Sequence, residues 1–576
     1  MNGAELLVST LKAHGVEHIF GLPGDTGMAF YDALYHDPSI THIMTRDERS
    51  ASFMADVYAR VAGRLGVCEG PSGGGATYIV PGVAEAHGSA IPLLCLTSDT
   101  PVSQQHWNVL TELDQVALFR PVTGWSERVL TPDAMGDAIR RSIRMALAGR
   151  PGAAHVSLPA DSLEAPVATL ADRGSHDALT DRAPRSRPHA GAQEIELAAR
   201  LIAQAERPVI VAGGGVLLSQ AWESLTNLAE SLGIPTGTSI NGKGAIAETS
   251  PVSIGVVGGN GARTYANAWV RDADLVIFIG TRTDSTTTDG WTLPSRTAPP
   301  TTIHIDVAER EIGNTYPNAA FLQGDARATI DDLTTALNGD AANIRKRNED
   351  RLRKLEAQRM QYLDQVDTWS RSKAWPMKPQ RVVAEMRQIL GDKVVIVADP
   401  GTPTPYLSAQ YLLRRAGRTT VIPRAHGGLG YALPGVVGAA YAAGNRQVIG
   451  MMGDGSFGMS VGELETISRL GLPVVLIQCA NQTFGWIKEL QHLYHDQRYY
   501  SVDFNGVAYA DIAKGFGLDA VEVDSPDAFA PSLRSALESG RPTFINVPTE
   551  AQLTETPPVA SWERATGAQA RKEGAS

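Results

Sequence analysis

The chain of 576 residues is too long for a single hydrophobic core and predicts about three or four domains of roughly 150 residues each. Its composition, 43% hydrophobic and 20% charged, is that of a globular protein. The net charge is −11, and no long run of either sign occurs. The charge distribution therefore gives no reason to expect that the protein binds nucleic acid. A small-molecule substrate is therefore expected.

Neither the apolar runs nor the cysteines indicate a membrane or secreted protein. Glu5 and Lys12 interrupt the apolar pattern of the first segment, which lacks the layout of a signal peptide. No apolar run approaches the roughly 18 residues needed to span a bilayer. Cys68, Cys95 and Cys479 show no CxxC spacing, so we expect neither a disulfide framework nor a cysteine metal site. We predict a cytoplasmic protein with no membrane partner.

Strand-like apolar runs alternate with helix-length segments throughout, which predicts α/β domains with mostly parallel sheets. The first block covers residues 1–165, and a polar stretch with Pro and Arg, 173–192, indicates a linker. The second block, 190–340, opens near "RPVIVAGGGVL" and is followed by a charged, helical connector, "IRKRNEDRLRKLEAQRMQYLDQV". The third block, 375–550, begins with "KVVIVADPGT" and ends in "PTFINVPTE". Residues 551–576 form a tail or lid.

Polar residues follow two strand-like runs of the third block. "RQVIGMM" leads into Gly453, Asp454, Gly455 and Ser456, and "LPVVLIQCAN" ends at Asn481, 27 positions after the aspartate. Ligands bind at the carboxyl ends of strands in open α/β sheets, where glycines let backbone N–H groups approach an anion. We also expect a helix that begins near Ser460 to present its positive N-terminus there. Asp and Asn are hard oxygen ligands, so the spacing predicts a magnesium–diphosphate site.

This GDG…N pattern resembles the signature of thiamine diphosphate (ThDP) enzymes. Together with "GGLGYALPGVVGAAYAAG" it is similar to the superfamily of acetolactate synthase, benzoylformate decarboxylase and 2-hydroxyacyl-CoA lyase, over nearly the whole chain. The resemblance implies three doubly wound parallel-sheet domains: pyrimidine-binding, central and diphosphate-binding. It also implies that the side chains of Asp454 and Asn481 and the backbone carbonyl of Thr483 bind Mg²⁺.

A second stretch, "RDERSASFMADVYAR", is similar to the family segment that carries the catalytic glutamate. The resemblance implies that Glu48 faces the aminopyrimidine ring of the cofactor and assists removal of the proton at its C2 atom. Taken alone, a Glu that opens a helix is usually a dipole or capping carboxylate. The presence of Asp454 and Asn481 favours the catalytic role.

Other site residues follow from the same resemblance. Leu429, next to Gly427, matches the bulky apolar residue that bends the cofactor, a role compatible with that of a core Leu. Gly401 and Thr402 of "DPGTPTP" lie where the family has its other diphosphate loop. Because the family joins the first block of one subunit to the third block of another, the resemblance implies a homodimer or homotetramer.

The residues around the reacting carbon are less typical of the family. Asp25 of "GLPGD" is either a proton relay or a turn-forming aspartate, and the adjacent histidine pair of simple 2-oxo acid decarboxylases is missing. Leu110 and Thr111 stand where many relatives have Phe and Gln, so Glu112 matches its motif only in part and is expected to be structural.

The central block carries a Gly cluster, "AGGGVL", which is weak support for a dinucleotide site. Relatives hold FAD, ADP or coenzyme A in this domain, or nothing. Arg263 and Arg282 either meet a nucleotide phosphate there or are surface or interdomain arginines.

We therefore expect a ThDP- and Mg²⁺-dependent enzyme that makes or breaks a carbon–carbon bond. The leading hypothesis is an acetolactate synthase-like carboligase or decarboxylase acting on a 2-oxo acid. The alternative is a 2-hydroxyacyl-CoA lyase that yields formyl-CoA and an aldehyde or ketone, favoured by the missing histidine pair and the length of the tail. A non-catalytic nucleotide-binding or regulatory protein on the same fold is the third possibility, and the presence of Glu48, Asp454 and Asn481 argues against it.

Overall fold

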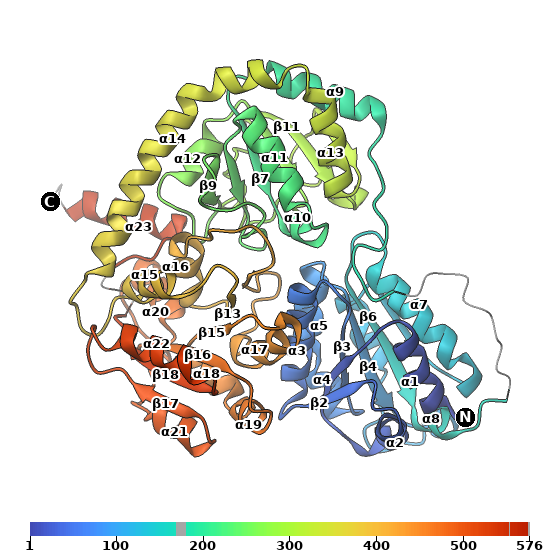
Figure 1. Ribbon diagram of the computed structural model, residues 1–576. Helices are drawn as coiled ribbons and strands as arrows, with labels where there is room; N and C mark the ends of the chain where they lie inside the picture. Colours follow the sequence, from blue (N-terminus) through green and yellow to red (C-terminus); the bar gives the residue numbers. More distant parts are fainter. Residues whose placement is uncertain (169–179, 552, 554, 574–576) are drawn as a thin grey trace. The chain divides into compact units, whose positions relative to one another are not determined.

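The computed structural model describes residues 1–168, 180–551, 553 and 555–573. Residues 173–179 of the expected linker, and residues 552, 554 and 574–576 of the expected tail, lie outside the described part of the chain. The chain forms two compact units. The first consists of Met1–Ser186, Pro423–Gly450 and Gly458–Val474, and the second of Arg187–Ile422, Met451–Phe457 and Val475–Ser576. Figure 1 shows the elements in sequence colours.

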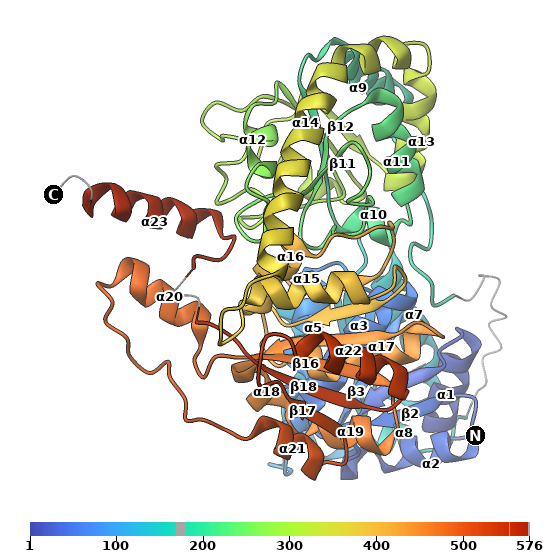
Figure 2. The same ribbon diagram turned by 60° about the vertical axis from the view of Figure 1, so that its left-hand side comes forward.

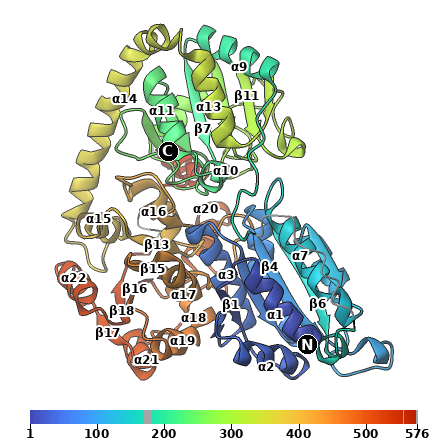
Figure 3. The same cartoon turned by 45° about the vertical axis from the view of Figure 1, so that its right-hand side comes forward.

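The first sheet, in the first unit, has the strand order β2-β1-β3-β4-β6-β5, and neighbouring strands pair in parallel. Its strands are β1 (His18–Gly21), β2 (Thr41–Met44), β3 (Gly66–Gly70), β4 (Leu93–Asp99), β5 (Trp125–Arg128) and β6 (Ala153–Pro159). The helices of this part are α1 (Gly3–Ala13), α2 (Met28–His36), α3 (Glu48–Ala62), α4 (Gly74–Tyr78), α5 (Val80–Gly88), α6 (Gln115–Phe119), α7 (Met135–Leu147) and α8 (Ala160–Glu164). Helices α1 and α7 share one apolar core with the strands, and α3 packs on β1 and β3 from the other side (Figure 3).

Helix α3 is buried along most of its length because a second helix of the same unit, α17 (Ala432–Ala443), lies against it. A Cβ atom at Gly438 would lie 2.0 Å from the carbonyl oxygen of Met54, so only glycine permits this approach of the two helices. The short helix α19 (Glu463–Arg469) also belongs to this unit. The Glu463 carboxylate accepts the backbone N–H of Arg46 at 2.9 Å.

The central sheet has the order β12-β11-β10-β7-β8-β9, again parallel. Its strands are β7 (Pro208–Ala212), β8 (Thr236–Thr238), β9 (Ser253–Val256), β10 (Leu275–Ile279), β11 (Thr301–Asp306) and β12 (Ala320–Gln323). Its helices are α9 (Ala192–Gln204), α10 (Gly214–Leu218), α11 (Trp222–Leu232), α12 (Ala266–Arg271), α13 (Ala326–Leu337) and the long α14 (Ala341–Ser370).

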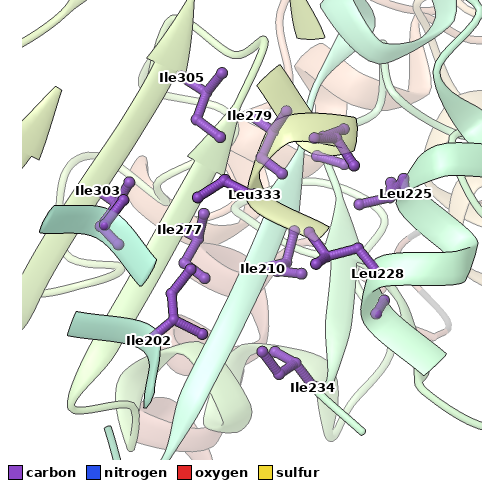
Figure 4. Packing of buried hydrophobic residues seen from close by; sticks show 14 of the residues in the cluster. Ile202, Ile210, Leu225, Leu228, Ile234, Ile277, Ile279, Ile303, Ile305 and Leu333 are labelled. Carbon is purple, nitrogen blue, oxygen red and sulfur yellow. The ribbon is translucent and has the colours of Figure 1, made fainter. Parts of the chain in front are cut away.

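Both faces of the central sheet are covered, which explains its uninterrupted apolar strands. Along β10, Ile277 and Ile279 face one core with α9, α11 and α13 (Figure 4), whereas Val276 and Phe278 face the other, with α12 and α14. A strand buried on both faces cannot alternate with polar residues, so "LVIFI" is apolar throughout.

The third sheet has the order β14-β13-β15-β16-β18-β17. Its strands are β13 (Val395–Ala398), β14 (Thr420–Val421), β15 (Val448–Gly453), β16 (Val474–Ala480), β17 (Asp519–Glu522) and β18 (Thr543–Pro548). The remaining helices are α15 (Pro379–Ile389), α16 (Pro403–Gln410), α18 (Asp454–Ser460), α20 (Gly485–Tyr494), α21 (Tyr509–Gly515), α22 (Phe529–Ser539) and α23 (Ala560–Glu573). The strand order reverses between β13 and β15, and ligands bind at such switch points of open α/β sheets.

The three parallel α/β sheets and the helical connector, seen as α14, confirm the predicted fold class. A helix begins close to Ser460 as expected, α19 at Glu463, but the short helix α18, which begins at Asp454 directly after β15, was not predicted. The glycines at 455 and 458 favoured a loop because glycine is a poor helix former. None of the described helices has the length and apolarity to cross a membrane.

Candidate active site

The Asp454 carboxylate connects the carboxyl ends of two neighbouring strands. The residue follows β15 directly and opens α18. Its Oδ2 atom accepts hydrogen bonds from the backbone N–H groups of Asn481 (3.0 Å) and Gln482 (2.6 Å), which follow β16. Its Oδ1 atom accepts one from Gly455 at 3.0 Å. The structure thus brings together Asp454 and Asn481, the pair singled out by its spacing.

The loop after β16 adds two more oxygens at this point. The side-chain oxygen of Asn481 accepts the backbone N–H of Thr483 at 3.3 Å. The Thr483 hydroxyl donates to the carbonyl of Val502 at 2.9 Å, so it is used within the loop. The Thr483 carbonyl accepts the N–H of Gly485 at 2.9 Å, and its second lone pair is left for another partner.

The surroundings of Asp454 fit a bound divalent cation. Burial raises the pKa of this carboxyl in spite of its backbone donors, so ionisation is costly without a nearby positive charge. Among the described residues, no Lys, Arg or His forms an ion pair with Asp454. The same residues contain no group of three or more His, Cys, Asp or Glu side chains that could hold a metal ion by themselves. One carboxylate, one amide and one carbonyl leave further positions to phosphate and water, as Mg²⁺ prefers.

Small residues keep the end of β15 open. A Cβ atom at Gly455 would lie 2.7 Å from the ring of Phe484, so a side chain there would collide with the loop after β16. At Gly453 the nearest atom to a built Cβ is the carbonyl of Cys479, 3.9 Å away. Ser456 is buried within α18. The N–H of Gly455 is taken up by Asp454 Oδ1, and the diphosphate contacts of Gly453, Gly455 and Ser456 stay predictions.

Gly401 and Thr402, the other expected diphosphate loop, lie between β13 and α16. The backbone N–H of Asp399 donates to the carbonyl of Met451 at 3.1 Å, which joins β13 to β15. The loop after β13 and the loop after β15 therefore leave neighbouring strands at the switch point of the sheet. The phosphate contact of Gly401 and Thr402 stays a prediction.

The far end of α16 is held by a buried ion network of the same unit. Glu248 pairs with Lys243 (2.8 Å) and Arg263 (3.2 Å), and all three side chains are almost fully buried. Lys243 and Arg263 donate to the last carbonyls of α16, those of Ser408 (3.0 Å) and Ala409 (3.1 Å). Positive charge at this end complements the helix dipole. Of the two alternatives for Arg263, the structure thus favours a structural arginine over a nucleotide ligand.

In the first unit, Glu48 opens α3 and is 7% exposed. Asp47 caps the helix by accepting the N–H of Arg49 at 2.7 Å, which leaves Glu48 free of the capping role. A Cβ atom at Gly75 would lie 3.1 Å from Glu48 Oε1, and one at Gly70 3.4 Å from its Cγ, so the two glycines make room for the carboxyl group. Burial raises the pKa of Glu48, which favours a protonated carboxyl that can donate a hydrogen bond.

Gly427 and Leu429 lie in a glycine-rich loop of the first unit, before α17. Gly427 and Gly430 have φ values of +76° and +79°, a conformation that other residues rarely adopt. Leu429 is only partly buried, so its side chain has a face available to a ligand. The structure therefore places the expected ring-contacting residues with Glu48 in one unit and the expected diphosphate residues in the other.

The residues expected near the substrate make local contacts. Asp25 is exposed and accepts the N–H of Thr26 at 2.9 Å, the contact of a turn-forming aspartate. Its role as a proton relay stays a prediction. Glu112 accepts the N–H of His106 at 2.6 Å, a structural contact of the kind the sequence indicated. Leu110 is 85% exposed.

The sequence analysis missed a buried polar network in the first unit. Asp56 and Arg60 of α3, Glu85 of α5 and Tyr431 before α17 contact one another by ion pairs and hydrogen bonds. The sequence does contain a sign of this network, because charged residues interrupt the otherwise apolar helix segments "FMADVYAR" and "VPGVAEAHG". A charged side chain buried in such a helix requires a partner, but the sequence pattern does not identify which residue that partner is.

The C-terminal helix α23 packs on α20, the helix that follows the Asn481 loop (Figure 2). The rings of Trp562 and Trp486 are 4.4 Å apart, and Trp562 shares a small apolar cluster with Leu493. Arg564 forms an ion pair with Asp289 through contacts of 2.6 and 3.2 Å. The tail is thus fixed to its own unit at two points.

Glu489 on α20 provides a test of pH dependence. It is 2% exposed, and its Oε2 atom has no hydrogen-bond partner within the described chain. Burial raises the pKa of Glu489 from 4.5 to about 7. Because the folded-state pKa is the higher one, the stability that the neutral acid contributes is present below pH 4.5 and is lost as the pH rises through 7.

We expect Glu489→Gln to raise the apparent melting temperature above pH 7, by the equivalent of roughly 1–3 kcal/mol, with little effect near pH 5. Thermal melts of both proteins between pH 5 and 8.5, at one scan rate, measure the difference. The exposed Glu349→Gln serves as the control. A difference that does not grow with pH would contradict the assignment.

Comparison with known proteins identifies the family. The thiamine pyrophosphate enzyme family matches in three parts: its N-terminal TPP binding domain over residues 1–118, its central domain over 195–333 and its C-terminal TPP binding domain over 401–547. A probable acetolactate synthase large subunit of Methanococcus aeolicus is 32% identical over 583 residues, covering 97% of this chain and 94% of the relative.

Two further relatives agree. The probable acetolactate synthase large subunit of Methanocaldococcus jannaschii is 33% identical, with 97% of this chain and 94% of the relative covered. Acetolactate synthase isozyme 3 large subunit of Escherichia coli is 28% identical, with 95% and 94% covered. With three TPP-enzyme matches and relatives along the whole chain, the protein belongs to the thiamine pyrophosphate enzyme family and is a ThDP-dependent, acetolactate synthase-like enzyme.

Proposed function

We propose that the enzyme binds ThDP through Mg²⁺ and acts on a 2-oxo acid, as an acetolactate synthase-like carboligase or decarboxylase. The observation that carries the magnesium site is the buried Asp454 carboxylate, which joins the ends of β15 and β16 beside the amide of Asn481. The names of the relatives support the substrate class.

Each side of the cofactor has its own residues in this proposal. Asp454, Asn481 and the carbonyl of Thr483 hold Mg²⁺. The diphosphate contacts come from Gly401, Thr402, Gly453, Gly455 and Ser456. Bound ThDP supplies an acidic C2–H group and an electron sink.

The ring side of the proposal rests on the first unit. Gly427 and Leu429 contact the aminopyrimidine ring and fix its orientation. Glu48, buried and with a raised pKa, holds a proton against a ring nitrogen. A buried carboxyl serves this purpose because desolvation keeps it protonated nearer to neutral pH.

We propose domain limits of 1–165, 190–340 and 375–550, with 551–576 as a tail or lid. We also propose a homodimer or homotetramer, in which residues of the first and third domains from different subunits complete each site. Sedimentation of the purified protein tests the assembly, and a monomer that retains full activity would contradict it.

The central domain is proposed to hold FAD, or else ADP or coenzyme A, with Arg282 as the phosphate-facing candidate. Arg263 is left out because its guanidinium pairs with Glu248. Mass spectrometry of ligands released from purified protein distinguishes the two cases. FAD would support the synthase-like function, and ADP or a CoA species would support the lyase.

The decisive experiment is a substrate comparison. With ThDP and Mg²⁺ supplied, we expect pyruvate to be consumed with release of carbon dioxide, and 2-hydroxyacyl-CoA esters to remain intact at every chain length. Product analysis by chromatography measures both reactions. Cleavage of a CoA ester to formyl-CoA, without consumption of pyruvate, would replace the proposal by the lyase.

The lyase alternative requires that the tail, residues 551–576, cover the substrate channel. A carbon nucleophile must be protected from water, so a lyase for bulky thioesters needs a cover over its channel. Deletion of residues 555–576 should then impair turnover of the CoA ester and leave ThDP affinity intact. If turnover of that ester is unchanged, the tail has no covering role.

A further inference from the structure

The Glu85 carboxylate anchors the glycine-rich loop before α17. Glu85 lies on α5, is 1% exposed and belongs to the same unit as the loop. It accepts the backbone N–H groups of Ala425 (3.2 Å), His426 (2.7 Å) and Gly427 (3.3 Å). Three successive amides on one carboxylate fix both the position and the orientation of this segment, because each bond constrains a different peptide plane.

Two further groups hold Glu85 itself. Arg60 of α3 donates to it at 3.1 Å, and the hydroxyl of Ser89 donates at 2.8 Å. Burial on its own would raise the pKa of Glu85, but Arg60 and the loop amides outweigh it and lower the pKa. The Glu85 carboxyl group is therefore ionised, and both of its oxygens accept hydrogen bonds.

The other end of the loop is tied to the same arginine. Tyr431 donates its hydroxyl hydrogen to Asp56 of α3, and Arg60 pairs with Asp56 at 2.9 Å. Asp56 and Tyr431 are fully buried. Glu85 binds the start of the loop, and Asp56 binds Tyr431 at its end. Arg60 pairs with both carboxylates and so connects the two anchors.

The loop between these anchors has little rigidity of its own. Gly427, Gly428 and Gly430 give it more conformational freedom than any other residue type would. A Cβ atom built at Gly427 would meet nothing within 4 Å, so packing does not fix the backbone there. At Gly428 a built Cβ atom would lie 3.1 Å from the ring of Phe53, so packing acts on the loop there, whereas around Gly427 the hydrogen bonds to Glu85 are what constrain the backbone.

We propose that Glu85 is a positioning residue, which holds the Gly427–Leu429 segment in the conformation that receives the aminopyrimidine ring. The inference rests on the proposed function in one respect, the ring contact of Leu429. It adds that the geometry of this contact is set by a carboxylate more than 300 positions earlier in the chain, on α5.

A purely structural role for Glu85 makes different predictions. Removing one partner of a buried ion network leaves the other charge uncompensated and destabilises the fold as a whole, so the effect of such a change is not confined to one loop. A structural role would change overall stability and would leave the loop and the cofactor reaction of the folded protein unchanged. A positioning role changes the loop first.

The first test uses the protein without cofactor. In Glu85→Gln we expect the backbone amides of residues 425–427 to exchange hydrogen at least tenfold faster, measured by mass spectrometry of the peptides. Asp325→Asn is the matched control. Asp325 is also buried, pairs with an arginine (Arg187, 3.0 Å) and accepts two backbone amides, but it lies in the central domain of the other unit. Unchanged exchange at 425–427, or equal acceleration in the control, overturns the proposal.

The second test measures proton exchange at C2 of bound ThDP together with its dissociation constant. We expect Glu85→Gln to slow C2 exchange at least tenfold and to change ThDP affinity less than threefold, because the diphosphate residues are untouched. Glu85→Asp, which keeps the charge, should recover part of the rate. Tyr431→Phe removes only the hydroxyl at the other anchor and replaces Glu85→Gln should that variant not fold.

Leu429→Ala separates the two hypotheses. If it leaves C2 exchange at the wild-type rate, the proposed ring contact is wrong and the positioning role falls with it. If Leu429→Ala slows the exchange and both Glu85→Gln and Tyr431→Phe leave it unchanged, the ring contact stands and only the role of Glu85 is overturned.

Discussion

Asp454→Ala is expected to lose Mg²⁺-dependent binding of ThDP, with a decrease in affinity of about 100-fold or more. Two effects add up. The substitution removes the one carboxylate ligand of the proposed metal site, so the charge of the diphosphate is left without its counter-ion. It also removes the acceptor for the N–H groups of Asn481 and Gln482, which fixes the loop after β16. Titration calorimetry with and without Mg²⁺ measures the loss.

Two variants make this result specific. Asp454→Asn keeps an oxygen for the backbone donors but lacks the charge, so it should bind ThDP more weakly than wild type and more strongly than Asp454→Ala. Asp511→Ala, an exposed aspartate on α21 that pairs with Lys514, should bind normally. Wild-type affinity in Asp454→Ala would remove the metal assignment altogether.

Glu48→Gln is expected to retain ThDP and to exchange the C2 proton about 100-fold more slowly or worse. General acid–base groups contribute on the order of 10²–10⁴ in rate, and an amide cannot donate the proton that the ring nitrogen requires. The isosteric change keeps the volume of the side chain between Gly70 and Gly75. Proton-exchange NMR on quenched samples, with calorimetry for affinity, measures both effects.

Glu5→Gln is the matched control, since Glu5 also lies in the first turn of a helix of this unit, where it takes part in the capping box and pairs with the amino group of Met1 at 3.6 Å. It should exchange the C2 proton at the wild-type rate. If Glu48→Gln also keeps that rate, the proton-transfer role belongs to another group, for which Asp25 is the other candidate.

The fold and the meeting of Asp454 with Asn481 could be predicted because their signals are local. Apolar strands such as "LVIFI" must be covered on both faces, which leads directly to parallel sheets with helices on each side. Asp454 and Asn481 are recognisable because the carboxyl ends of adjacent parallel strands lie together, however long the intervening segment is.

The missed features depend on contacts between distant segments. The sequence left open that Arg263 binds a phosphate. In the structure its guanidinium instead binds Glu248 and the end of α16, and no short sequence pattern indicates these contacts. Likewise, the acceptor for the amides of residues 425–427 is Glu85, and a sequence pattern gives no partner for a buried charge. The start of α18 was missed because helix propensity is a weak guide where tertiary contacts decide.

The packing of Trp562 against Trp486 gives the enzyme an optical reporter of its own. Two indoles whose ring centres are 4.4 Å apart, at different tilts, couple their electronic transitions, so the near-ultraviolet circular dichroism of the pair differs from that of separated indoles. Trp486 lies five residues after Asn481, and Trp562 belongs to the tail. Any departure of α23 from α20 is therefore visible without a label, in real time, during the binding of cofactor or substrate.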